Sequence, residues 1–454
     1  MKEYSLAGCG GVGGPTGANF LLKTPKLSIL VDCGLIQGSH FVMEENETNF
    51  SYNPKEISFL LITHAHMDHI GRIPKLVKDG FSGVIYSTIE TRELAVYMLE
   101  DAEKLIAHEA NESHREPIYD KENVFHALSL WKTLPYHTSL DLSDVISIYF
   151  KDAGHILGSA IIEINLKEIG KKIVFTGDLG NSPTPLLRNT EIVSDADYMI
   201  IESVYGDRNH EPKNARDAKL RSVLMESLNR GGTVVIPAFS LERTQVILYE
   251  INELVEKKKI PRAPIFLDSP LAIKVTSVYR VHTENFNEKV RGIISGGDDI
   301  FDFSGLKVVR NPMESEAIHS RHGAKIIIAG SGMSVGGRVL SHELFYLSDP
   351  NATILLVGYQ VPGSLGRRIE EHAPNVSING QNISVRAHIE KISGFSSHKD
   401  SDGLVDFVSH SAKTLKKVFV AMGENKSASF LAQRLCDELD VDAIVQEKGK
   451  EYKL

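Results

Sequence analysis

Short apolar runs recur along the whole chain, and longer stretches with a helical pattern of apolar residues separate many of them. This alternation predicts an α/β protein with buried strands. The expected strands are 27–31, 59–62, 173–175, 199–201, 234–236, 265–267, 326–328, 354–357 and 418–420. The expected helices are 91–110, 215–229, 242–256 and 427–439. Because ligand sites of α/β sheets lie at the carboxyl ends of strands, the residues directly after these strands are the first candidates for a functional site.

One strand end carries four potential metal ligands within six residues, in the run HAHMDH. His64 and His66 point the same way in extended chain, and a following turn brings Asp68 and His69 to a neighbouring position. Neutral imidazoles with a carboxylate are the ligand set of catalytic zinc, which keeps one position open for water. The run alone does not complete two metal sites, so further ligands are expected downstream. The downstream candidates in a glycine loop or after a strand are His155 and Asp178.

The composition excludes several classes of protein. Three cysteines without a CxxC pair argue against a secreted disulfide scaffold and against a zinc site built on cysteine. The stretch from Met1 to Tyr4 has no leader pattern, and no apolar run approaches the ~18 residues of a membrane span, so we expect a cytoplasmic protein with no membrane partner. With 50 basic against 59 acidic residues, no global positive field attracts nucleic acid. Any nucleic-acid site must therefore be a local groove.

A glycine pattern near the N-terminus offers a competing interpretation. The segment from Gly8 to Gly13 matches the dinucleotide-binding GxGxxG, and Asp32 follows where a ribose-binding acid is expected. The fingerprint requires a helix directly after the glycines. Further glycines and prolines interrupt this stretch, and 19–22 reads as a second strand, so nicotinamide binding is not expected.

Taken together, the motifs resemble those of the metallo-β-lactamase superfamily. Asp32, the HxHxDH run, His155 and Asp178 match four of its motifs in chain order. Further segments resemble its β-CASP branch, the nucleic-acid-processing ribonucleases related to the pre-mRNA 3′-end cleavage endonuclease. These segments are 201–208, 331–338, 366–368 and 393–398. The likeness covers essentially the whole chain.

The resemblance implies an α/β fold, namely an αββα metallo-β-lactamase sandwich with an inserted α/β β-CASP domain. Residues 1–205, completed by 385–454, would form the metallo-β-lactamase domain. Residues 206–384 would form the β-CASP domain.

The resemblance also implies a site with two zinc ions. Its implied ligands are His64, His66 and His155 for the first ion, Asp68 and His69 for the second, and Asp178 as a bridge. Asp32 would orient ligands from outside the metal shell, and with Asp68 it counts among the catalytic residues. His398 would protonate the leaving oxygen, and Glu202 would keep its imidazole oriented and protonated.

One position departs from the family pattern. The family usually has a histidine before Gly-Glu after a strand, as a ligand of the second zinc ion, and this chain has Met422 before Gly423 and Glu424. A thioether is a poor ligand for Zn²⁺. We therefore expect a second site that is one ligand short and binds its ion weakly.

A glycine-rich loop from Gly330 to Arg338 follows an expected strand and precedes a helical stretch. Backbone N–H groups and an arginine suit a phosphodiester backbone. The predicted phosphate contacts are Ser331, Gly332, Arg338, Arg367 and Arg368. A structural glycine turn and solvated arginines remain equally good interpretations.

The resulting hypothesis is a zinc-dependent hydrolase that cleaves single-stranded RNA at phosphodiester bonds with a metal-bound hydroxide. One alternative is another dinuclear-zinc hydrolase of small esters or thioesters, which would need neither Glu202 nor His398 nor the inserted domain. A second is a weakly active RNA-binding homologue, marked by Met422. The sequence leaves a homodimer open.

Overall fold

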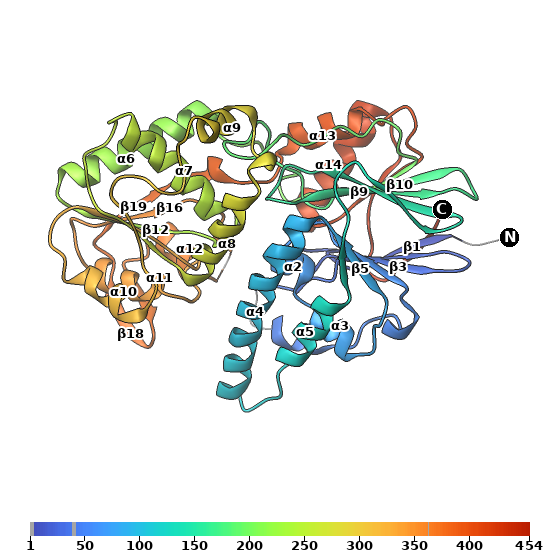
Figure 1. The fold of residues 1–454 in the computed structure, drawn as a ribbon, viewed down its shortest axis with the longest axis horizontal. Coiled ribbons are helices and arrows are strands. Elements are labelled where there is room, and N and C mark those ends of the chain that lie inside the picture. The colour runs from blue at the N-terminus through green and yellow to red at the C-terminus, as the bar shows by residue number, and fades with distance from the viewer. Residues whose placement is uncertain (1–3, 39–41, 362) are drawn as a thin grey trace. The chain divides into compact units, whose positions relative to one another are not determined.

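The computed structural model describes residues 4–38, 42–361 and 363–454 (Figure 1). Residues 1–3, which belong to the N-terminal stretch without a leader pattern, lie outside the described residues. The chain divides into two compact units, one of residues up to Asn209 together with His398–Leu454, and one of His210–Ser397. The sequence predicts domain borders at 205/206 and 384/385. Each predicted border lies upstream of the corresponding border between the two units, at 209/210 and 397/398.

The first unit contains two seven-stranded mixed sheets. The first sheet has the order β22 (Glu451–Lys453), β1 (Ser5–Gly10), β2 (Asn19–Lys23), β3 (Ser28–Val31), β4 (Phe59–Leu61), β5 (Val84–Ser87) and β6 (Trp131–Thr133). Its pairs are antiparallel from β22 to β3 and parallel from β3 to β6. Since β2 follows the glycines of the GxGxxG match, the helix that a dinucleotide site needs is replaced by a strand, as predicted.

The second sheet of this unit carries the later strands. Its order is β21 (Ala443–Val445), β20 (Lys417–Val420), β11 (Tyr198–Ile201), β10 (Lys171–Phe175), β9 (Ala160–Leu166), β8 (Ile146–Asp152) and β7 (Ser139–Ser143). The pairs are parallel from β21 to β10 and antiparallel from β10 to β7.

Helices complete this unit. They are α1 (Val42–Glu47), α2 (Met67–Ile70), α3 (Ile73–Lys78), α4 (Ile89–Glu112), α5 (Lys121–Ser129), α13 (Ser401–Ser409) and α14 (Asn425–Leu439), with a 3₁₀ turn at Pro54–Glu56. Helices α3–α5 lie beside the first sheet, and α13 and α14 pack on the second (Figure 1). Phe20 and Phe175, with ring centroids 6.1 Å apart, join the apolar layer between the sheets. These four layers confirm the αββα sandwich.

The second unit contains a six-stranded parallel sheet. Its order is β14 (Leu306–Val308), β13 (Ile265–Asp268), β15 (Lys325–Ala329), β12 (Thr233–Pro237), β16 (Thr353–Leu356) and β19 (His388–Lys391), and β17 (Asn375–Ile378) and β18 (Gln381–Ser384) form a hairpin. The central strands β12 and β15 are buried on both faces, as parallel strands between helices must be.

Helices also cover both faces of this sheet. They are α6 (Lys213–Asn229), α7 (Arg243–Glu256), α8 (Pro270–Val281), α9 (Glu288–Ser295), α10 (Pro312–His319), α11 (Val339–Tyr346) and α12 (Leu365–Glu370), with 3₁₀ turns at Thr283–Asn285 and Ser393–Phe395. Helices α10–α12 pack on one face, and α6 and α7 lie on the other (Figure 1). Among the residues that the structure describes, none of the helices combines the length and the apolar character that crossing a bilayer requires.

A buried acid in α11 makes the stability of the second unit depend on pH. The Glu343 carboxyl is fully buried and accepts a hydrogen bond from the Ser334 hydroxyl, while its Oε2 has no hydrogen-bond partner in the described part of the chain. Burial raises the pKa of Glu343 to about 8 from its ordinary value of 4.5. The folded protein therefore holds a proton at pH 7 that the unfolded chain releases.

Glu343→Gln is expected to change the pH profile of stability. An acid with a raised folded pKa loses stability as pH rises from its unfolded value through its folded value. Between pH 5 and pH 8 the free energy of unfolding should fall by roughly 3–4 kcal/mol more in the wild type than in the variant. Urea unfolding of both proteins at the two pH values measures this difference. Parallel pH profiles would show that Glu343 is ionised in the folded protein.

Candidate metal centre

The predicted site residues of the first unit lie where strands of its two sheets end. Asp32 follows β3, and Thr63 and His64 lie after β4, which is parallel to β3. On the second sheet Asp178 lies after β10, and Glu202 directly follows β11, which is parallel to β10. Because carboxyl ends of parallel strands meet at one edge, these side chains converge although they are far apart in the sequence.

Four donor atoms meet at this edge, one each from His64, His66, His155 and Asp178. His64 Nε2 lies 3.1 Å from His66 Nδ1, and His155 Nε2 lies 3.3 Å from the same atom. Asp178 Oδ2 lies 3.4 Å from His64 Nε2 and 3.6 Å from His155 Nε2. Zn–N bonds of about 2.0–2.1 Å place the ligand atoms of a tetrahedral ion roughly 3.3 Å apart. The four donors therefore fit a tetrahedral zinc ion.

The charges of these groups agree with a metal site. Burial lowers the pKa of His64 and holds the pKa values of His66 and His155 well below their usual range, so the three imidazoles are neutral. Burial alone would raise the pKa of Asp178, but the neighbouring histidines, His69 first among them, hold it well below its usual range. Three neutral imidazoles and one ionised carboxylate are the form in which these side chains bind zinc.

His69 turns its two ring nitrogens toward two carboxylates. Nδ1 lies 2.7 Å from Asp32 Oδ2, and Nε2 lies 3.5 Å from Asp178 Oδ1. Asp32 also accepts hydrogen bonds of 2.8 Å from the N–H and the hydroxyl of Thr63. The buried His69 Nε2 has no hydrogen-bond partner among the residues that the structure covers. A carboxylate that fixes one ring nitrogen while the other faces a cation is the usual setting of a metal-binding histidine.

Asp68 lies beside this group, in the short helix α2. Burial raises the pKa of its carboxyl, with Asp178 adding to the effect and His69 opposing it. Within the described ranges, Asp68 is not among the donors that converge within 4.8 Å of one another. His69 and Asp178 therefore carry the geometric case for a second ion, and ligation by Asp68 stays a prediction.

Met422 lies just after β20 and is buried in the apolar layer between the sheets. Its backbone has a φ of 49°, in the left-handed region that non-glycine residues rarely adopt. The residue lines a narrow void together with Asp32, Thr63 and Gly177. Such backbone strain is found at functional sites, yet a thioether here offers zinc no strong donor.

Met422→His is expected to tighten binding of a second zinc ion roughly 10- to 100-fold, because it places an imidazole at the void lined by Asp32 and Thr63, the two residues that contact His69 Nδ1. In the wild type this ion should exchange faster than the first and leave at moderate chelator concentration. Competition titrations with a zinc chelator measure both affinities. Met422→Leu is the matched control, since it keeps an apolar side chain and adds no donor. Equal affinity for the second ion in wild type and Met422→His would falsify the missing-ligand interpretation.

Next to the donor cluster, His398 pairs with Glu202. His398 Nδ1 lies 3.1 Å from Glu202 Oε2 and 3.9 Å from Asp178 Oδ2. The Glu202 carboxylate is fully buried and accepts a second hydrogen bond, of 2.6 Å, from the Leu179 N–H. Burial acts to lower the pKa of His398, but Glu202 and Asp178 outweigh it and raise the pKa to about 9. The structure thus brings together the acid and the histidine that the sequence predicts as a pair.

Residues that the sequence analysis did not single out hold the His155 loop. The buried Asp152 accepts a 2.8 Å hydrogen bond from the Gly154 N–H and pairs with Arg188 Nη2 at 2.8 Å. The Ser159 hydroxyl oxygen accepts the N–H of His155 at 3.0 Å. Asp152 is the last residue of β8, a strand that the sequence did not predict. Without that strand, Asp152 could not be recognised as an acid at a strand end.

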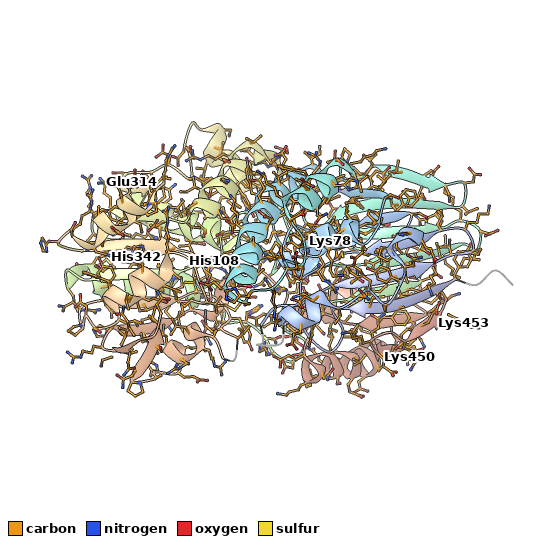
Figure 2. All side chains as sticks on the ribbon, turned by 90° about the horizontal axis from the view of Figure 1, so that it is seen from below. Lys78, His108, Glu314, His342, Lys450 and Lys453 are labelled. Atoms are coloured by element: carbon orange, nitrogen blue, oxygen red, sulfur yellow. The ribbon has the colours of Figure 1, made fainter. Side chains whose placement is uncertain are left out.

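In the second unit, Arg338 lies at the start of α11. Its Nη1 donates to Asp268 Oδ1 at 2.5 Å, and its guanidinium also donates to the carbonyl oxygens of Val309 and Arg310, each at 3.2 Å. His342, labelled in Figure 2, binds the other oxygen of Asp268 through Nε2 at 2.8 Å. These contacts attach α11 to the end of β13, and a phosphate contact by Arg338 stays a prediction.

The other predicted phosphate contacts lie on two separate elements. Ser331 and Gly332 belong to the loop after β15, whereas Arg367 and Arg368 lie on α12. The Ser331 hydroxyl oxygen accepts a backbone N–H of its own loop at 3.1 Å. Arg367 pairs with an acid one turn further along the helix at 2.7 Å, and Arg368 donates to a backbone carbonyl at 3.1 Å.

Three family descriptions match consecutive parts of the chain. Residues 21–204 match the metallo-β-lactamase superfamily domain, and residues 244–369 match the β-CASP domain. Residues 382–446 match the Zn-dependent metallo-hydrolase RNA specificity domain.

Among curated relatives, Ribonuclease TTHA0252 of Thermus thermophilus is 37% identical over 393 residues, which are 87% of this chain and 88% of that protein. This chain belongs to the β-CASP ribonuclease family of the metallo-β-lactamase superfamily. The predicted family and the prediction of a metal-dependent hydrolase are thereby confirmed. The family is zinc-dependent, and the match to an RNA specificity domain implies an RNA substrate.

Two further relatives cover the β-CASP chain almost completely. An RNase J-like protein of Methanocaldococcus jannaschii is 31% identical, covering 94% of both chains. The transcription termination factor FttA of Methanosarcina mazei is 32% identical over 97% of this chain and 70% of its own length. A solved structure of a protein of unknown function from Enterococcus faecalis shares the fold, with a TM-score of 0.58, 12% identity and full coverage of both chains.

Proposed function

We propose that this β-CASP protein is a zinc-dependent ribonuclease that cleaves phosphodiester bonds of single-stranded RNA. The observation that carries the proposal is the position of the His398–Glu202 pair beside the zinc-type donor cluster, with His398 Nδ1 3.9 Å from Asp178 Oδ2. The names of two relatives, a ribonuclease and an RNase J-like protein, support the substrate class.

The donors divide into two sets around Asp178. His64, His66 and His155 would hold the first zinc ion, His69 with Asp68 would hold the second, and Asp178 would bridge the two. When bound, zinc supplies Lewis-acid activation of water and neutralises charge that develops on the phosphoryl oxygens. Asp32 keeps His69 in orientation through its 2.7 Å contact with Nδ1.

His398 is proposed as the general acid for the leaving ribose oxygen. With a pKa raised to about 9, its imidazole is protonated at neutral pH and carries a proton on each ring nitrogen. The Nδ1 proton is held by Glu202 at 3.1 Å, which fixes the ring and leaves the Nε2 proton for transfer. The Leu179 N–H fixes Glu202 in turn.

The alternative is a dinuclear hydrolase of small esters or thioesters. An ester with a good leaving group needs no proton donor, so it gives no reason for the His398–Glu202 pair. A labelled single-stranded RNA, a matched duplex and a generic thioester, each incubated with the zinc-loaded protein, separate the functions. We expect cleavage of the single strand, slower cleavage of the duplex and no thioester turnover. Thioester turnover without RNA cleavage would reject the proposal, as would RNA binding without turnover.

A further inference from the structure

Three neighbouring strands of the second unit are each followed by a loop that exposes an apolar side chain. Phe239 comes after β12, Val335 after β15 and Tyr359 after β16, and their exposed fractions are 36%, 64% and 41%. The strands are adjacent and parallel, in the order β15-β12-β16, so the three loops share one edge of the sheet. Clustered apolar side chains at a surface mark a binding site more often than single ones do.

The Phe239 ring rests on main chain. A Cβ on Gly332 would lie 2.7 Å from Phe239 N and 2.8 Å from Phe239 Cδ2, so only glycine fits there. A Cβ on Gly358 would contact Cε2 of the ring at 3.7 Å. The Phe239 carbonyl oxygen accepts both the N–H and the hydroxyl of Thr244, at 3.1 and 2.7 Å, which ties the residue to α7. The ring is therefore supported by two glycines while more than a third of the residue stays exposed.

The two glycine loops are joined by the fully buried Gln360. Its Nε2 donates to the carbonyl oxygens of Gly332 at 3.0 Å and Gly358 at 3.4 Å. This link holds both loops against the Phe239 ring. A rigid aromatic surface loses little conformational entropy when a planar ligand stacks on it.

Polar groups at the same edge suit a phosphodiester chain. The Ser240 and Ser269 hydroxyl oxygens lie 3.2 Å apart, in the segments that lead into α7 and α8. The Arg367 side chain is 34% exposed and lies on α12, the helix that follows the Tyr359 loop. An aromatic face next to hydroxyls and a guanidinium matches a nucleobase with its flanking phosphates.

We propose that Phe239 is a stacking platform for a nucleobase of single-stranded RNA, with Tyr359 beside it. The proposal rests on the proposed function in taking RNA as the ligand, and it adds a contact of the second unit that is independent of the metal site. An unpaired base exposes the π-face that the ring needs, whereas a duplex hides it. The platform therefore favours single strands without reading their sequence.

Anisotropy of a fluorescent single-stranded RNA tests the platform, in a His398→Ala background that keeps the RNA intact. Phe239→Ala is expected to raise the Kd roughly 10- to 100-fold. Phe239→Leu, which keeps an apolar side chain without a π-face, should lose nearly as much. Phe239→Trp should retain the affinity, and RNA should quench its emission beyond that of Trp131, the one native tryptophan. The matched control is Phe430→Ala, an exposed phenylalanine of the first unit, which should bind as the parent does.

Two results would overturn the platform: wild-type affinity in Phe239→Leu, or no additional quenching in Phe239→Trp. Both variants keep a bulky apolar side chain, so they decide the matter even where Phe239→Ala fails to fold. RNA that binds the native chain in a Phe239-dependent manner but is never cleaved would reject the proposed function and leave the platform standing. RNA that is cleaved, with affinity independent of Phe239, would reject the platform alone.

Discussion

His64→Ala is expected to remove the first zinc ion and reduce RNA cleavage to the background rate. His64 Nε2 is 3.1 Å from His66 Nδ1 and 3.4 Å from Asp178 Oδ2, so its loss opens the donor cluster at its centre. Elemental analysis after zinc reconstitution and gel filtration measures the metal content. His108→Ala is the matched control, because His108 is an exposed histidine of α4 (Figure 2).

The control should keep the zinc content and the activity of the wild type. Wild-type protein that emerges metal-free from the same reconstitution would contradict the assignment of the cluster. Equal zinc content in His64→Ala and His108→Ala would do so as well.

His398→Ala is expected to lower RNA cleavage by ~10²–10⁴-fold, the range for one proton-transfer residue, while zinc content stays unchanged. The loss should be much smaller for bis(p-nitrophenyl) phosphate, because a nitrophenolate leaves without protonation. Initial rates on both substrates measure the contrast. Glu202→Gln keeps a hydrogen-bond acceptor but removes the charge that raises the pKa of His398, so it should lower RNA cleavage in the same direction.

A different result would reassign His398. Asp178, Glu202 and His398 also form a group of donors within 4.8 Å of one another. If His398→Ala lost a metal ion, or lost activity equally on both substrates, His398 would be a ligand and not the general acid.

Nine strands with parallel neighbours were predictable because their buried residues form continuous apolar runs, namely β3, β4, β10, β11, β12, β13, β15, β16 and β20. The shorter or more exposed parallel strands β5, β6, β14, β19 and β21 were not predicted. The antiparallel strands β7–β9 were not predicted, because charged residues interrupt their pattern. Lys151 of β8 pairs with Glu163 of β9 at 3.0 Å, and Glu163 also pairs with Lys172 of β10 at 2.9 Å. Each of these charges is neutralised by a residue on the neighbouring strand. The sequence of one strand alone does not show which charge lies opposite it.

The metal ligands could be predicted because histidine and aspartate are metal-binding residue types, and their positions after predicted strands can be seen in the sequence. Asp152 acts through Arg188, 36 residues further along the chain, and only the folded chain shows that contact. From the sequence, Phe239 is expected to be one more buried core residue after a strand. Its exposure depends on the positions of the two loops that carry Gly332 and Gly358, which only the folded chain shows. Met422 could be recognised as a departure from the family pattern, but its burial between the sheets could not.

Zinc-dependent cleavage of single-stranded RNA is the most direct test of the account. The rate is measured on one labelled RNA before chelation, after complete removal of zinc, and after zinc is added back in stoichiometric steps. We expect cleavage to disappear with the metal and to return as the His64–His66–His155–Asp178 cluster fills, with a further rise as the weaker second ion binds. RNA cleavage that continues at an unchanged rate in the zinc-free protein would contradict the account.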